Sequence, residues 1–216
     1  MSGRVRHSNV IIRIMSKEDI SQVVELQKAS FPIMASEGVY WKPDQLDSHL
    51  KVFPEGQFVA EYKERIIGSC SSLIIKLEPE YKEHTWKEAC GNSFFVNHDP
   101  KGDTLYGADV STHPDYRRLG VATKLYNVRK DLATKLNLRR IIAGGRLINY
   151  CEYAKVFSPL DYVKKVKRHE IKEPVLSFQL RNGFKFIKIL PNYMQDPRSL
   201  NYATFIEWKN PNFVEK

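Results

Sequence analysis

The sequence is poor in cysteine and shows no metal-binding pattern. Cys70, Cys90 and Cys151 lie far apart and form no C-x-x-C pair, so a disulfide framework or a zinc site is not expected to organise the fold. The six histidines show no H-E-x-x-H or comparable spacing. We therefore predict no metal cofactor.

Long apolar segments are also missing. The longest uncharged apolar runs cover about seven residues, whereas about 20 are needed to cross a bilayer. The N-terminus shows no secretory apolar segment. These absences predict a cytoplasmic protein that does not enter the membrane.

Acidic residues are outnumbered by basic ones. The chain has 34 Lys and Arg against 25 Asp and Glu, a formal net charge of +9, which favours polyanionic partners. Basic groups such as Arg129-Lys130, Arg139-Arg140 and residues 164–168 either attract such a ligand or form ordinary solvated faces. No DNA- or RNA-binding motif accompanies them, so we do not expect nucleic acid as a partner.

The hydrophobic content of 42% in 216 residues is enough for one substantial core. The chain shows no internal repeat, low-complexity tract or interdomain linker. We therefore predict a single domain over residues 1–216.

Residues 105–136 combine a strand, a polar turn and a helix. An apolar run ends at Val110, and the turn contains Pro114. The helix then has apolar residues at helical spacing, namely Val121, Leu125, Val128, Leu132 and Leu136. The first N–H groups of such a helix have no partner within it and are free to bind an anion. Gly120 allows close approach to the main chain, Ala122 is small, and Arg117 and Arg118 add positive charge.

The motif Arg117-x-x-Gly120-x-Ala122, after Val110-x-Thr112-x-Pro114, resembles the acyl-CoA-binding signature of the GCN5-related N-acetyltransferases (GNAT family). The resemblance implies acetyl-CoA as a co-substrate, with its pantetheine arm along the main chain of Val110 and Thr112. It places the pyrophosphate on the residues of the turn, which are Arg117, Arg118, Leu119, Gly120, Val121, Ala122 and Thr123. The bare motif is short, and a plain loop before a surface helix is the alternative.

The order of the other predicted elements fits the same family. We expect a strand at residues 10–14, a helix from a capping box at Ser16 and Asp19 to Ser30, a second helix at 44–52, and a hairpin of 57–62 with 66–75. A fifth strand covers 140–146, and two closing strands cover 184–190 and 202–208. The fold implied is mixed α/β (α+β): about seven mostly antiparallel strands, splayed at the acyl-CoA site and flanked by helices.

A narrower resemblance comes from residues 144–150, Gly-Gly-Arg-Leu-Ile-Asn-Tyr, and the basic insertion after them. Together they are similar to the acetyltransferase domain found fused to a carbon-nitrogen hydrolase. Since no hydrolase residues follow up to Lys216, we expect that domain in isolation.

The irregular segments are the ones expected to contact the acceptor. By resemblance, residues 31–54 line its cleft, where Tyr40 and Trp41 are either substrate contacts or packing residues. Residues 76–104, with a short helix at 81–90, form either a wall of the acceptor site or a surface insertion. For this reason the sequence does not identify the acceptor.

Two positions near the end of the chain bear on the cofactor and the leaving group. Family members often place an asparagine after the fifth strand to bind the arm of the cofactor, which points to Asn149; an Asx-turn is the alternative. Gln179 stands where the family has a tyrosine acid, and an amide cannot donate that proton. Either the thiolate leaves unassisted or a tyrosine of the insertion replaces the acid, the candidates being Tyr150, Tyr153 and Tyr162.

An amine must lose a proton before it attacks the thioester, so a base is required. Asp109 is the carboxylate nearest the expected oxyanion donor, the Val110 N–H. Strand alternation turns Asp109 away from Ala108 and Val110 unless a bulge intervenes. Tyr106 and Glu61 are the other candidates.

We therefore expect an acetyl-CoA-dependent N-acetyltransferase that transfers the acetyl group to an amine by direct attack in a ternary complex. A catalytically weak acyl-CoA sensor is the alternative, and a nucleic-acid binder is the third hypothesis. The oligomeric state is open, with a homodimer as one option.

Overall fold

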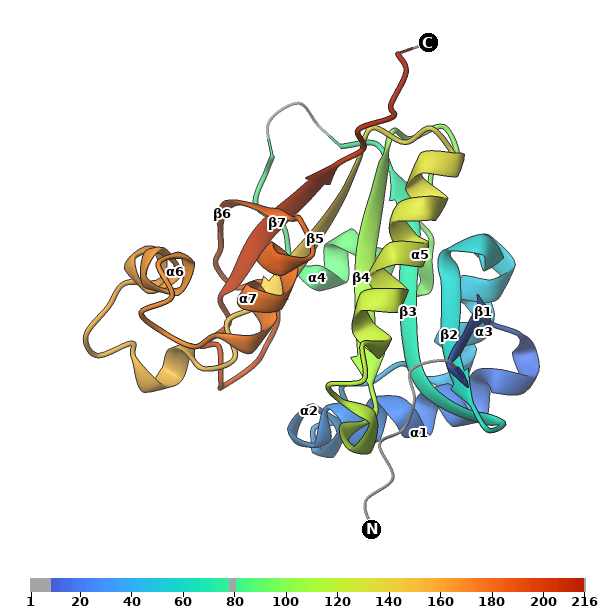
Figure 1. Cartoon of the computed structure of the whole chain (residues 1–216), viewed down its shortest axis with the longest axis horizontal. Helices are drawn as coiled ribbons and strands as arrows, with labels where there is room; N and C mark the ends of the chain where they lie inside the picture. The colour runs from blue at the N-terminus through green and yellow to red at the C-terminus, as the bar shows by residue number, and fades with distance from the viewer. Residues whose placement is uncertain (1–8, 78–80, 216) are drawn as a thin grey trace.

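The computed structural model describes residues 9–77 and 81–215 (Figure 1). Its centre is a seven-stranded sheet in the order β1-β2-β3-β4-β5-β7-β6. Only β4 and β5 pair in parallel; the other neighbours are antiparallel. The strands are β1 (Ile11–Ile14), β2 (Gln57–Tyr62), β3 (Arg65–Ile75), β4 (Thr104–Thr112), β5 (Arg140–Arg146), β6 (Lys185–Leu190) and β7 (Ala203–Lys209). This confirms the predicted mixed, mostly antiparallel sheet.

Helices cover both faces of the sheet (Figure 1). They are α1 (Ile20–Ser30), α2 (Pro32–Ser36), α3 (Pro43–Val52), α4 (Trp86–Ala89), α5 (Val121–Lys135), α6 (Pro159–Lys167) and α7 (Pro174–Arg181). Because successive strand residues point to opposite faces, neighbours such as Leu105 and Tyr106 enter different cores. Leu105 packs in the core under α5 and α7, and Tyr106 in the core under α1, α3 and α4.

The predicted start of the first helix is confirmed. The Ser16 N–H and hydroxyl donate to the Asp19 carboxylate at 2.8 and 3.1 Å, which closes a capping box before α1. The buried face of α1 carries Val23, Val24 and Leu26, and also the polar Gln27, which is only 3% exposed. A buried amide needs hydrogen-bond partners, and those of Gln27 lie at the site described below.

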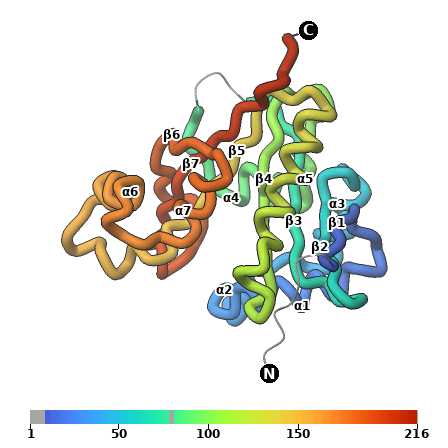
Figure 2. Tube along the Cα trace, viewed as in Figure 1, coloured from blue at the N-terminus to red at the C-terminus, as the bar shows by residue number. Residues whose placement is uncertain are grey.

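Two segments differ from their predicted structure. The helix expected at residues 81–90 is confined to α4, preceded by a Thr85 cap that accepts the Glu88 N–H. The insertion after β5 contains α6, which the sequence did not reveal, and it projects as a lobe beside β6 and β7 (Figure 2). The buried Glu173 anchors the lobe, since its carboxylate accepts the Tyr162 hydroxyl at 2.9 Å and the Asn149 N–H at 3.1 Å.

The α3 helix is tied to the segment before β4 by a buried histidine. His49 Nε2 lies 2.8 Å from the Ser93 carbonyl, and the imidazole stacks on Phe95 with 3.6 Å between ring centroids. Burial lowers the pKa of His49 from 6.5 to about 4. The folded protein therefore holds this ring neutral.

This histidine predicts a loss of stability in acid. As the pH falls below 6.5, the unfolded chain takes up a proton that folded His49 does not bind until about pH 4, so stability is lost over that window. At about 1.4 kcal/mol per pH unit, the loss reaches about 3 kcal/mol. Urea unfolding at pH 7.5 and 4 is expected to show a smaller acid loss for His49→Gln than for the unmodified chain. Equal losses would contradict the assignment.

Candidate active site

The two parallel strands separate near their middle. The pairing of β4 with β5 begins at Thr104↔Arg140 and ends at Gly107↔Ala143. Beyond that point β4 continues to Thr112 along β3, while β5 continues to Arg146 along β7. Figure 1 shows the two strands diverging toward the N-terminal end of α5. The predicted splay is present, and it exposes one edge of β4.

A β-bulge lies at the point where the strands part. Gly107 pairs with Ser72 and Asp109 with Ser71, so Ala108 is an extra residue in β4. A bulge shifts the alternation of side chains by one. It places Asp109 on the α1 side of the sheet, the same side as Tyr106 and Ala108. The sequence left this orientation open, and the bulge decides it.

Asp109 is held by two donors. Gln27 Nε2 donates to Asp109 Oδ2 at 2.6 Å and to Ser111 Oγ at 2.7 Å, and Ser111 Oγ donates to the same Oδ2 at 2.9 Å. No hydrogen bond between described residues reaches Asp109 Oδ1. Burial raises the pKa of Asp109 above its ordinary value, although these two hydrogen bonds oppose the shift. A carboxylate with one anchored oxygen and a raised pKa is suited to accept a proton.

The two other candidate bases are engaged elsewhere. The Tyr106 side chain is fully buried, with its hydroxyl 2.7 Å from that of Tyr193, and burial raises its pKa well above the ordinary value. Glu61 lies on β2 and accepts a hydrogen bond from Arg13 Nε at 2.8 Å. Of the three, only Asp109 lies at the point where the strands part.

Beyond Gly107, some main-chain N–H and C=O groups of β4 face the side where β5 no longer pairs with it. The His113 N–H donates to the Ile67 carbonyl at 2.9 Å, and hydrogen-bonded and non-bonded pairs alternate along an antiparallel ladder. The groups of Val110 and Thr112 therefore face away from β3. The Thr112 hydroxyl is buried and has no partner among the described residues.

The turn before α5 has the shape of an anion site. Gly120 is the N-cap residue with φ +75°, and nothing lies within 4 Å of the position a Cβ would take. The first hydrogen bond of the helix runs from the Lys124 N–H to the Gly120 carbonyl. The N–H groups of Val121, Ala122 and Thr123 come before it and have no acceptor within the helix. Gly120 offers no side chain to cap them.

Close packing fixes the position of this helix end. A Cβ on Gly68 of β3 would lie 2.7 Å from Val121 Cγ1, so only glycine lets the first turn of α5 lie this close to the sheet. Arg118 has φ +66°, an unusual conformation for a residue with a side chain. Arg117 and Arg118 are exposed, and Arg117 Nη2 donates to the Ser30 carbonyl at 3.3 Å. Leu119 is partly buried against the α5 core.

Asn149 is engaged by the protein. Its side chain donates to the Lys172 carbonyl at 3.2 Å and accepts from Arg198 Nη2 at 3.2 Å. The amide thus links the end of β5 to the lobe and to the β6–β7 connection. A contact with the cofactor stays a prediction.

The tyrosines considered as replacement acids have other partners. The Tyr162 hydroxyl donates to Glu173, and the Tyr150 hydroxyl donates to the Phe157 carbonyl at 2.9 Å. Tyr153 stacks with Phe157 in the same lobe. Gln179 is buried against Gly145, where a Cβ would lie 2.2 Å from Gln179 Oε1.

The segment before β4 packs across the sheet beside Asp109. The Trp86 indole donates to the Ala108 carbonyl at 2.9 Å, and the Trp86 N–H donates to the Tyr193 carbonyl at 2.7 Å. Trp41 is buried beside Trp86, whereas Tyr40 is half-buried under Lys42, whose Nζ lies 3.4 Å from the ring centroid. Trp41 is thus a packing residue.

Four residues that contact the β4 residues of this site were not predicted from the sequence as part of it: Gln27, Trp86, Arg129 and Tyr193. For Gln27 a signal existed, because it is a polar residue on the apolar face of a predicted helix. The partners of the others come from segments remote in the chain.

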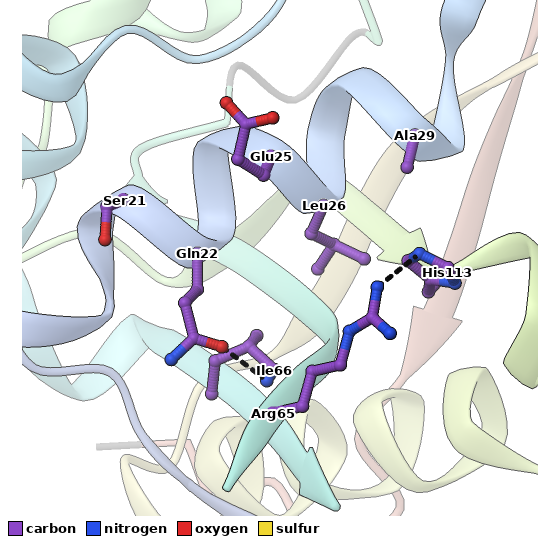
Figure 3. A pocket seen from close by; sticks show the side chains of 8 residues that line it. All are labelled: Ser21, Gln22, Glu25, Leu26, Ala29, Arg65, Ile66 and His113. Atoms are coloured by element: carbon purple, nitrogen blue, oxygen red, sulfur yellow. Dashed lines mark hydrogen bonds between the residues drawn. The ribbon is translucent and has the colours of Figure 1, made fainter.

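A separate open groove of about 390 Å³ lies between α1 and the start of β3 (Figure 3). Two hydrogen bonds cross it: the Ile66 N–H donates to Gln22 Oε1 at 3.0 Å, and Arg65 Nη2 lies 3.0 Å from His113 Nε2. No predicted site residue lines this groove.

Within residues 9–77 and 81–215, no helix has the length and apolarity to span a bilayer. The same residues contain no group of three or more His, Cys, Asp or Glu side chains that could hold a metal ion.

Two curated relatives come from Bacillus subtilis (strain 168). "Probable hydrolase YhcX" is 46% identical over 206 residues, which cover 95% of this chain but 39% of that protein. "Uncharacterized N-acetyltransferase YkwB" is 42% identical over 199 residues, covering 92% of this chain and 88% of that protein. The greater length and the name of the first relative are consistent with the predicted resemblance to a domain fused to a hydrolase.

Among solved structures, the GphF GNAT-like decarboxylase in complex with isobutyryl-CoA matches with a TM-score of 0.75 and covers 92% of this chain and 98% of that chain. At 18% identity this likeness shows the fold alone. The family model described as the acetyltransferase (GNAT) family matches residues 20–150. We conclude that the chain belongs to the acetyltransferase (GNAT) family, which confirms the family and the enzyme class, an acetyltransferase, that the sequence predicted.

Proposed function

We propose that this chain transfers the acetyl group of acetyl-CoA to an amine by direct attack in a ternary complex. One arrangement carries the proposal: the carboxylate of Asp109 and the main chain of Val110 adjoin at the point where β4 leaves β5. The same β4 leads into the uncapped N-terminus of α5. A base, an oxyanion donor and an anion site thus belong to one continuous segment.

The donor binds along that segment. The diphosphate of acetyl-CoA accepts hydrogen bonds from the first amides of α5, above Gly120, where a Cβ would have open space around it. Arg117 and Arg118 add charge at the rim. The pantetheine arm lies along the groups of Val110 and Thr112 that face away from β3. GphF, which shares this fold, holds isobutyryl-CoA, and this supports an acyl-CoA site here.

Transfer begins with removal of a proton from the amine. Asp109 Oδ1 accepts that proton, directly or through a water molecule, since Oδ2 is already held by Gln27 and Ser111. The amine nitrogen attacks the thioester carbon, and the Val110 N–H stabilises the resulting oxyanion. The C–S bond then breaks. The nitrogen releases its second proton to solvent as the amide forms. The thiolate departs without an acid, since a thiol pKa of about 8.5 makes it a good leaving group, and it takes its proton from solvent.

One observation favours a second candidate, a weakly catalytic acyl-CoA sensor. Gln179 stands where an acid is expected, and two tyrosines of the lobe direct their hydroxyl protons to Glu173 and Phe157. A sensor needs the anion site and not the proton-transfer groups.

Calorimetry with acetyl-CoA and a thiol-release assay test both candidates. Binding in the micromolar range is expected for either, and no measurable heat would contradict both. A panel of polyamines, amino acids and peptide amines is then expected to contain an acceptor that releases CoA thiol. Release by no acceptor would favour the sensor.

A further inference from the structure

A buried arginine lies behind the bulge of β4. Arg129, in the middle of α5, is only 2% exposed. Its Nε donates to Ser72 Oγ at 2.9 Å, and its Nη2 donates to the carbonyls of Asp109 at 2.7 Å and Ser71 at 3.1 Å. These acceptors lie on both strands of the irregular register, so one guanidinium bridges β3 and β4 where the bulge interrupts their ladder.

The guanidinium also lies beside the last pair that joins β4 to β5. A Cβ on Gly107 would lie 2.9 Å from Arg129 Nη1 and 3.5 Å from the Ala143 Cβ. Gly107 and Ala143 form the final β4–β5 pair. Any side chain at Gly107 would displace the guanidinium, so glycine is what allows a cation to reach the point of separation.

This cation is not balanced by a carboxylate in direct contact. No ion pair among the described residues includes Arg129, and no described hydrogen bond uses its Nη1. Arginine stays protonated in proteins, and a buried charge without a partner is costly. Three neutral oxygens accept its hydrogen bonds, and the ring centroid of Tyr126 lies 5.6 Å from its Cζ. A positive charge kept in this position favours negative charge that develops nearby.

The contact with Asp109 connects the cation to the oxyanion donor. The Asp109 carbonyl and the Val110 N–H belong to one peptide group, and a trans peptide directs them to opposite sides. Arg129 donates to the carbonyl, while the N–H faces the side from which β5 has diverged. A charged donor on the carbonyl polarises the peptide and makes its N–H a stronger donor, because linked hydrogen bonds reinforce one another.

We propose that Arg129 is a positioning residue for acetyl transfer. It bridges β3 and β4 at the bulge, and it polarises the peptide group whose Val110 N–H donates to the thioester oxygen. The inference rests on the proposed function, since it needs acetyl-CoA to bind along β4. Arg129 acts through the peptide group and is not itself assigned a contact with the substrate.

Infrared spectroscopy of bound [1-¹³C]acetyl-CoA tests this role. A polarised thioester carbonyl vibrates at lower frequency, so the bound stretch of the unmodified chain is expected below that of free acetyl-CoA. Arg129→Gln retains an amide donor but removes the charge and is expected to lose most of that downshift. Its kcat is expected to fall about tenfold, with the KM for acetyl-CoA within about threefold, because ground-state binding depends on the turn before α5.

Arg129→Lys and Ser72→Ala complete the set. Lysine keeps the charge but lacks the planar fork, so an intermediate shift and kcat are expected, and this variant is used if Arg129→Gln does not fold. Ser72→Ala removes only the Nε acceptor and is expected to retain the downshift.

An unshifted carbonyl in the unmodified chain would overturn the inference, as would a folded Arg129 variant that binds acetyl-CoA with the full downshift. Failure of the unmodified chain to bind acetyl-CoA would overturn the proposed function itself. The two failures are therefore distinguishable.

Discussion

Replacing Asp109 with asparagine is expected to lower kcat for acetyl transfer by about 10²- to 10⁴-fold, the usual contribution of a positioned base. The asparagine side chain preserves the size of the group and an oxygen for the Gln27 and Ser111 donors, but it cannot accept the amine proton. Steady-state rates at saturating acetyl-CoA measure the effect. A kcat within threefold of the unmodified chain would remove Asp109 from the mechanism.

The pH dependence separates loss of a base from general damage. Without Asp109, attack needs amine that is already deprotonated in solution, so the variant's rate is expected to rise about tenfold per pH unit toward the amine pKa of about 10.4. The unmodified chain is expected to level off above the raised pKa of Asp109. Parallel profiles would contradict a proton-transfer role.

The direction in which Asp109→Asn changes the stability of the fold can also be predicted. A carboxyl whose folded pKa is raised stabilises the fold below its unfolded pKa, and that contribution is lost as the pH rises through the folded pKa. At a pH above that folded pKa the carboxylate therefore does not help folding, and there the asparagine variant is expected to unfold at no lower temperature. A large drop would mean that the carboxylate is needed for the fold.

Glu61→Gln is the matched control for this experiment. Glu61 was the other carboxylate considered from the sequence, and on β2 it is paired at 2.8 Å with Arg13 of the edge strand β1. Its replacement is expected to leave kcat within about twofold. A loss equal to that of the Asp109 variant would show that the assay reports general damage.

Replacing Gly120 with alanine is expected to weaken acetyl-CoA binding by about tenfold to a hundredfold. Charge-assisted hydrogen bonds contribute about 1.5–3 kcal/mol each, and the added methyl group occupies the space above the first amides of α5 that the diphosphate needs. The position is open in the protein, with nothing within 4 Å of a Cβ. The added methyl group is therefore expected to clash with the ligand and not with the protein. Calorimetry with acetyl-CoA and with CoA measures the loss of affinity.

The Gly183→Ala variant is the control for the effect of backbone strain. Gly183 follows α7 with φ +81°, close to the +75° of Gly120, and a Cβ there would make only ordinary contacts at 3.8 Å and beyond. Both variants place alanine in the left-handed region, at a cost of about 1 kcal/mol. Only the Gly120 variant is expected to lose affinity. Equal affinities for the two variants would refute the assignment of the turn.

Local patterns in the sequence determined much of this molecule. The strand, turn and helix of residues 105–136, the glycine at the start of that helix and the capping box at Ser16 depend on contacts between near neighbours in the chain. Periodicity and turn residues encode such features directly. The seven strands and the family followed from the order of these elements, and so did the region of the predicted site.

The tertiary structure decided which groups face the site. Alternation along β4 alone turns Asp109 away from Ala108; the extra residue opposite β3 reverses this, and register is a property of two strands that one strand cannot encode. The donor that orients Asp109 is Gln27, 82 residues earlier, and the guanidinium behind the bulge comes from the next helix. Sequence patterns report short-range geometry, whereas proton transfer depends on side chains that only packing brings within hydrogen-bond distance.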